Sequence, residues 1–198
     1  MLTKRQNMIE TMKVGGHPDR FVNGYEALGL VMGSPFGKRN PNPKPGELNV
    51  VNAWGVTRSW PAGMPGAFPE HAPEKIVIKD IEEWQDYVTA PDPYSIAEAE
   101  WEKDLEYWET IDRKEKFATM FIAPGLFEQC HYLMEIQNCL MAFYENPDEM
   151  HELVDMYTEW ELAYAAELCK YVKPDAIFHH DDWGSQISTF ISPDMFRE

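Results

Sequence analysis

The sequence has few basic residues, little cysteine and no long apolar run. Its 198 residues carry 17 Lys and Arg against 34 Asp and Glu, a formal net charge of −17. Nucleic-acid affinity comes largely from Lys and Arg that displace counterions, so this balance excludes nucleic acid and anionic membrane surfaces as expected partners. No apolar run could span a bilayer, and no apolar stretch follows Lys4 and Arg5 as a secretory signal would require. We therefore expect a cytoplasmic protein that does not bind membranes.

Several common motifs are also missing. The chain contains no GxGxxG, P-loop, GxSxG or HExxH, which removes the usual dinucleotide, nucleotide triphosphate, serine-hydrolase and zinc-protease assignments. Its three cysteines, Cys130, Cys139 and Cys169, have no CxxC spacing and lie in apolar, helical patterns. We expect three buried thiols rather than a disulfide or a metal site.

The chain has enough aromatic and hydrophobic residues for a packed core. It has 10 Phe, 9 Tyr and 7 Trp, and 44% of its residues are hydrophobic, so it is expected to fold, as one domain of ordinary length. Residues 33–73 hold eight of the 15 prolines and six of the 12 glycines. Such a Pro/Gly-rich insertion is either a loop that covers a site or an exposed excursion with a β-hairpin at 50–59.

Hydrophobic periodicity predicts strands that alternate with helices. The expected helices cover residues 3–14, 81–88, 94–112 and 126–144, and one more runs from Pro147 to the residue before Pro174. We expect N-cap residues at Thr3, Asp80, Asn146 and Ser192. The expected strands cover residues 20–25, 75–79, 116–123 and 176–180. Strands followed by long helices indicate parallel β/α units, so the predicted fold class is α/β.

Residues 178–186, FHHDDWGSQ, follow an apolar strand, and the carboxyl ends of parallel strands are where such folds carry chemistry. His179 and His180 cannot both face one side of the strand, because side chains alternate. Three uses of this cluster compete: a metal site, general acid/base chemistry by an Asp and His pair, and a structural role in which Asp181 or Asp182 caps the turn above Trp183.

Two further places are candidates. In residues 123–128, APGLFE, a strand enters a helix whose free amides favour an anionic group, and Glu128 is interpreted there as a helix-start acid. Asn23, Tyr25 and Glu26 on the first strand, with Trp54 from the insertion, suit a small polar or aromatic ligand. The other histidines are interpreted as surface or packing residues: His17, His71, His131 and His151.

Taken together, several segments resemble the uroporphyrinogen decarboxylase superfamily. They are GGHPDRF, NAWGV, IKDIEEWQDY, FATMFIAPGLFEQCHYL, ENPDEMHEL, KPDAIFHHDDWGSQ and SPDMFRE. The resemblance covers nearly the whole chain and is most specific over residues 173–198. It implies a TIM (β/α)8 barrel of which this chain is the N-terminal half. Because residues 192–194 open a helix of which little remains, we expect the natural chain to continue past Glu198.

The superfamily has two main chemistries. Uroporphyrinogen decarboxylases, lyases of porphyrin biosynthesis, carry an arginine-rich motif after the first strand that binds the substrate's carboxylates. This chain has no arginine between Arg20 and Arg39. The resemblance therefore favours the other branch, methyltransferases that move a methyl group from a methoxylated or methylamine-type donor to a corrinoid protein. In that branch zinc is bound by a His-x-Cys motif and a later Cys, which are expected beyond Glu198.

The site expected from this reading lies in a barrel mouth. The catalytic candidates are His180, Asp181 and Asp182, and the substrate-binding candidates are Asn23, Tyr25, Trp54, Trp183 and Gln186. His180 or Asp181 would move the proton that makes the demethylated oxygen or nitrogen a good leaving group. The non-catalytic alternative is a half-barrel interaction module that pairs through its exposed edge with a second copy, as a homodimer, or with a corrinoid protein.

Overall fold

The structure is a computed structural model that describes residues 1–31 and 34–197, without the side chain of Asp104. The chain forms two compact units, each assembled from three segments. Unit 1 comprises Met1–Pro35, Ser95–Ile122 and Ala165–His179, and unit 2 comprises Phe36–Tyr94, Ala123–Tyr164 and His180–Glu198. That the two belong to a single barrel domain stays a prediction.

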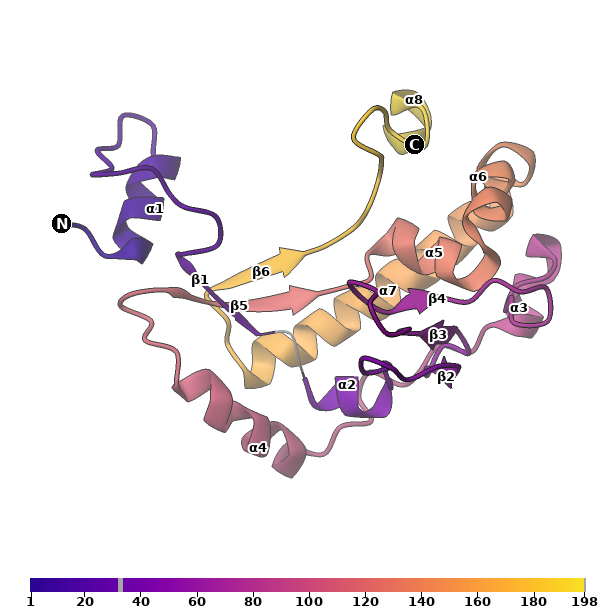
Figure 1. Ribbon diagram of the computed structural model, residues 1–198, viewed down its shortest axis with the longest axis horizontal. Coiled ribbons are helices and arrows are strands. Elements are labelled where there is room, and N and C mark those ends of the chain that lie inside the picture. The colour runs from indigo at the N-terminus through magenta and orange to yellow at the C-terminus, as the bar shows by residue number, and fades with distance from the viewer. Residues whose placement is uncertain (32–33, 198) are drawn as a thin grey trace. The chain divides into compact units, whose positions relative to one another are not determined.

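Unit 1 is built on a parallel sheet of three strands. In it β5 (Phe117–Ile122) lies between β1 (Leu28–Val31) and β6 (Ala176–His179). Figure 1 shows where the three strands lie in the chain. The register pairs Leu28 with Phe117 and Phe121 with Phe178. Consecutive residues at the centre of β5 are buried, as expected for a strand covered on both faces. The α/β class predicted from the sequence is confirmed.

One helix of unit 1 begins where the sequence predicts, and a second begins later than expected. In α1 (Lys4–Met12) the Thr3 side chain accepts from the Gln6 amide at 3.1 Å, as predicted. The next helix of this unit, α4 (Glu98–Glu109), begins four residues later than the expected Tyr94. Its Trp101 is fully buried and stacks on Tyr171 with 5.1 Å between ring centroids.

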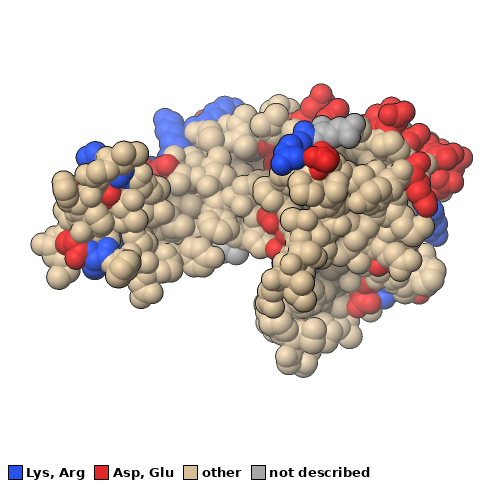
Figure 2. Space-filling view, turned by 90° about the horizontal axis from the view of Figure 1, so that it is seen from above, with Lys and Arg blue, Asp and Glu red and all other residues tan. Residues whose placement is uncertain are grey.

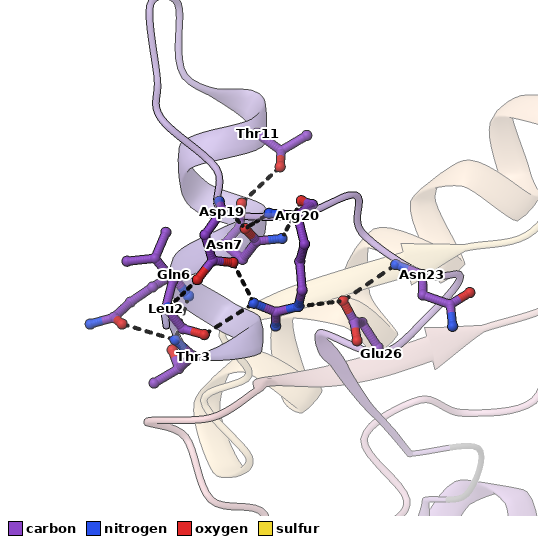
Figure 3. A network of polar contacts seen from close by, with 9 residues as sticks. All are labelled: Leu2, Thr3, Gln6, Asn7, Thr11, Asp19, Arg20, Asn23 and Glu26. Carbon is purple, nitrogen blue, oxygen red and sulfur yellow. Dashed lines mark hydrogen bonds and ion pairs between the residues drawn. The ribbon is translucent and has the colours of Figure 1, made fainter.

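The strand predicted at 20–25 is wrong. The Oδ1 atom of buried Asn7 accepts from the backbone amides of Asp19 at 2.9 Å and Arg20 at 3.3 Å, and its Nδ2 donates to the Arg20 carbonyl at 2.9 Å (Figure 3). These side-chain bonds occupy the backbone groups that a strand would pair. The first strand therefore begins later, at Leu28.

At the amino-terminal end of the sheet, Asp175 joins three segments of unit 1. Its carboxylate lies 3.0 Å from Arg5 and 3.6 Å from Arg113, and it accepts from the Ala118 amide at 2.9 Å. Burial alone would raise the pKa of Asp175, but the two arginines and the amide together lower it. Polar groups at this end of parallel strands serve stability rather than chemistry.

Unit 2 contains a small antiparallel sheet within the Pro/Gly-rich insertion. Its strands are β2 (Val50–Val51), β3 (Thr57–Ser59) and β4 (Phe68–Pro69), preceded by the short helix α2 (Pro35–Arg39). The β-hairpin predicted at 50–59 is confirmed, whereas Gly33, the expected first residue of the insertion, lies outside the described residues. That the insertion covers a site stays a prediction.

The strand predicted at 75–79 is also wrong. The amides of Val77 and Ile78 both donate to the carbonyl of Leu133, at 3.0 and 2.9 Å, so the end of a helix takes the bonds that a neighbouring strand would make. The helix expected next is present as the 3-10 turn η1 (Ile81–Glu83) and α3 (Trp84–Tyr87). The predicted cap is confirmed, since Asp80 accepts from the Glu82 amide at 3.0 Å.

The single helix expected at 126–144 is two helices. These are α5 (Leu126–Met134) and α6 (Ile136–Glu145), divided at Glu135, whose φ of 74° no helix interior permits. The following α7 (Pro147–Tyr171) begins after Asn146 as predicted. In α8 (Pro193–Arg197), Ser192 accepts from the Met195 amide at 3.2 Å, which confirms that cap.

Two of the three thiols are buried as expected. Cys130 and Cys139 lie in the core, and burial raises the pKa of Cys130 to about 12. Cys169 is exposed, so its predicted burial is wrong. The physical reason is helical geometry, because Leu168 takes the buried position and the next residue is turned about 100° from it.

No helix within the described residues is long and apolar enough to cross a membrane. Asp and Glu side chains gather at the right-hand end of the face seen in Figure 2. In Figure 1 that end carries α3 and α6, and the acidic residues of these elements and of η1 are Glu82, Glu83, Asp86 and Glu145. This distribution suits the low affinity for polyanions expected from the composition.

Candidate active site

Gly125 marks the place where the loop after β5 meets the loop after β6. Its backbone has φ −79° and ψ −171°, which any residue can adopt. A Cβ atom here, however, would lie only 2.5 Å from Cγ of Asp181 and 2.6 Å from the carbonyl oxygen of His180. The glycine is therefore required for the close approach of these two loops of unit 2.

Asp181 caps the first turn of α5. Its Oδ2 accepts from the Phe127 amide at 3.0 Å and its Oδ1 from the Glu128 amide at 2.9 Å. Trp183 Nε1 also donates to Oδ2, at 2.8 Å. Free amides at a helix start favour an anion, and here the protein's own carboxylate supplies it. The arrangement corresponds to the structural role considered for Asp181, with the cap on a neighbouring helix rather than on its own turn.

Glu128 and His180 form the central pair of the site. Glu128 is 6% exposed, and its Oε2 lies 3.0 Å from Nδ1 of His180. The Glu128 carboxylate also accepts hydrogen bonds from the Gly125 amide and from the Tyr132 hydroxyl, each at 3.4 Å. The side chain of His180 is 39% exposed, so the pair joins a buried carboxylate to an imidazole that solvent can reach.

This pairing controls the protonation of His180. The hydrogen bond to Glu128 raises the pKa of His180, burial lowers it, and the charges of Glu128, Asp182 and Asp181 raise it further, with a net upward shift. Because Nδ1 faces Glu128, the other ring nitrogen, Nε2, is the atom turned toward Asp182, 3.8 Å from Oδ1. An imidazole held protonated at Nδ1 can give or take a proton at Nε2.

Two more predicted residues follow in the same loop. Trp183 is 50% exposed and packs against Phe196 with 4.7 Å between ring centroids. Gln186 is exposed, in a segment closed by the bridge between Gly184 and Thr189. As alternation along the strand requires, His179 at the end of β6 is exposed while His180 turns toward Glu128.

The remaining predicted substrate contacts belong to other segments of the chain. Trp54 is 4% exposed and packs edge-on against the rings of Tyr157 and Trp160, in the core of unit 2. Asn23 and Tyr25 belong to unit 1, where the Asn23 amide donates to Oε1 of Glu26 at 3.3 Å (Figure 3). That Asn23, Tyr25 and Trp54 bind substrate together with His180 stays a prediction.

Sequence reasoning missed part of this site. Glu128 does act as a helix-start acid, but its contact with His180, 52 residues away, has no local signal. Tyr132 follows Glu128 by one helical turn, a spacing that could have linked them. Burial and the charge of Glu128 raise the pKa of Tyr132 to about 12, so this hydroxyl stays a proton donor to Glu128 at neutral pH.

Within the described part of the chain, no group of three or more His, Cys, Asp or Glu side chains could hold a metal ion. The zinc ligands that the family resemblance implies are expected beyond Glu198, and that expectation stays a prediction. No family model, no curated protein and no solved structure matches the chain.

Proposed function

We propose that the protein is a methyltransferase that takes a methyl group from a small methoxylated or methylamine-type donor and passes it to a corrinoid protein. The observation that carries the proposal is the Glu128–His180 pair within unit 2, formed by the two segments that follow β5 and β6 along the chain. The resemblance to the uroporphyrinogen decarboxylase superfamily supplies the reaction class.

We also propose that the fold is part of a TIM barrel. The strand order β1-β5-β6 follows the chain, all three strands are parallel, and their connections contain helices. This is the order that a TIM barrel would have, because each barrel strand pairs with the next along the chain. We infer that the sheet of unit 1 is an arc of such a barrel.

His180 would act as the general acid. Removal of the methyl group breaks its bond to the donor's oxygen or nitrogen, and that bond's electron pair stays on the heteroatom. Nε2 of protonated His180 gives its proton to that atom, while Glu128 holds the ring through Nδ1 and stabilises the charged form. Water then returns a proton to His180. No step is assigned to zinc, because its expected ligands lie beyond Glu198.

The test uses the protein expressed from its complete gene, with reduced cobalamin as acceptor and methylation followed by absorbance. A panel of methoxylated aromatics and methylated amines serves as donors. His180→Asn removes the proton-carrying group, and we expect the rate to fall about 100-fold or more.

The matched control is His179→Asn, which removes an imidazole one residue earlier on the exposed side of the strand. We expect its rate to stay within about twofold of the unmodified protein. Equal rates for the two variants, or no methyl transfer from either donor class, would overturn the proposal.

A further inference from the structure

Asp181 follows His180 directly in the chain, and its carboxylate bonds the backbone of Glu128. Its oxygens accept from the Phe127 and Glu128 amides at 3.0 and 2.9 Å and from the Trp183 indole at 2.8 Å. Hydrogen bonds to a charged acceptor are about twice as strong as neutral ones. One side chain next to His180 thus holds the backbone of Glu128.

We propose that Asp181 is a positioning residue, whose carboxylate fastens the loop after β6 to the first turn of α5 and so keeps Glu128 and His180 at hydrogen-bond distance. This role of Asp181 rests on its hydrogen bonds to α5. Only its effect on the reaction rests on the proposed function. A proton carrier would need to exchange its proton with substrate, whereas this carboxylate is engaged by three N–H donors.

Gly125 is also needed for this contact between the loop after β6 and the first turn of α5. Because its φ is accessible to any residue, the absence of a side chain serves only to admit Asp181. A methyl group in that position would collide with Cγ of Asp181 and with the carbonyl of His180. Gly125→Ala therefore displaces the carboxylate while leaving every charge in the site unchanged.

The test must separate the effect of the charge of Asp181 from the effect of its position. Among the described residues, the charged groups that act on His180 are Glu128, Asp182 and Asp181, and the negative charge of each raises the pKa of His180. Removing the charge of Asp181 would lower that pKa even if the residue positioned nothing. The informative variants are thus Gly125→Ala and Asp181→Glu, which keep the charge, and Asp182→Asn, which removes a charge that does not bond α5.

The experiment measures amide hydrogen exchange at Phe127 and Glu128 and the pKa of His180 by NMR. For Gly125→Ala we expect exchange at both amides to rise about tenfold, with the pKa of His180 shifted down. Asp181→Glu should do the same, because its longer side chain does not fit beside Gly125. Asp182→Asn should lower the pKa of His180 and leave the two exchange rates unchanged.

The proposal fails if Gly125→Ala or Asp181→Glu, once folded by circular dichroism, retains the exchange rates and the His180 pKa of the unmodified protein. If one of them does not fold, the other decides. These readouts need no substrate, so absence of methyl transfer would refute the proposed function without touching this assignment.

Discussion

At the scale of single residues, the buried carboxylate of Glu128 links the stability of the protein to pH. Its hydrogen bond raises the pKa of His180 above the ordinary value of 6.5. A group whose pKa is raised by folding stabilises the folded state fully below its unfolded pKa. That contribution is lost as the pH rises through the folded pKa of His180.

Glu128→Gln should therefore destabilise the protein in a pH-dependent way. We expect a loss of about 1 kcal/mol in the free energy of unfolding near pH 5.5, where His180 is protonated, and a smaller loss near pH 9. Urea unfolding at the two pH values measures both, and an NMR titration should show the pKa of His180 moving down.

The control for this prediction is Glu102→Gln, on the exposed face of α4, which should change stability by under about 0.5 kcal/mol at either pH. An equal loss for Glu128→Gln at both pH values would contradict the pairing with a protonated imidazole.

At the scale of elements, Glu135 separates two helices that the sequence presents as one. Its φ of 74° and ψ of 148° are a conformation that glycine adopts freely and other residues rarely. In compensation its side chain caps α6, accepting from the amides of Gln137 at 2.9 Å and Asn138 at 3.2 Å. The break therefore combines an unfavourable backbone with a favourable cap.

Two substitutions at Glu135 distinguish a break from a continuous helix. Both Glu135→Ala and Glu135→Gly lose the cap, at a cost of about 1 kcal/mol. Glycine also relieves the backbone, so we expect Glu135→Gly to be the more stable of the two by about 1 kcal/mol. In a helix interior the order is reversed, since Ala is favoured there by about 1 kcal/mol.

Thermal and urea unfolding of this matched pair give the answer directly. A more stable Glu135→Ala variant would mean that residues 126–144 form one helix in solution, as the apolar pattern predicts.

The two mispredicted strands have a common cause at this scale. Residues 20–25 and 75–79 have strand-like patterns, but their neighbours compete for the backbone. Asn7 binds the first segment, and the carbonyl of Leu133 binds the second. Neither competitor is close in sequence to the segment it binds, so local propensity could not have revealed it.

At the scale of the whole molecule, the sheet of unit 1 has two edges. Among the described residues β1 and β6 each pair with β5 alone, and Ile177 on β6 is 45% exposed. An edge strand with exposed apolar side chains is a template for pairing with another chain. We expect this chain to self-associate in a concentration-dependent manner.

Ile177→Lys should weaken that association, because a charged side chain on an edge strand opposes pairing. Light scattering coupled to size exclusion measures the mass over a range of concentrations, and we expect the variant's dimerisation constant to weaken about tenfold or more. The control is Leu162→Lys on α7, a helical position that is 66% exposed. Equal effects of the two variants would attribute association to exposed apolar area rather than to the strand edge.

Local patterns in the sequence determined several features by themselves. They predicted the α/β class, a buried strand at 116–123 that the structure has at 117–122, the hairpin of the insertion and the caps at Thr3, Asp80 and Ser192. Periodicity and capping act over a few residues, so the chain itself carries that information.

Only the tertiary structure decided how the site is assembled. It placed Asp181 on the first turn of α5, Glu128 against His180 and Trp54 in the core of unit 2. Each of these contacts joins residues about 50 or more positions apart. The approach at Gly125 and the burial that raises or lowers a pKa exist only once distant segments have packed, and therefore no local pattern encodes them.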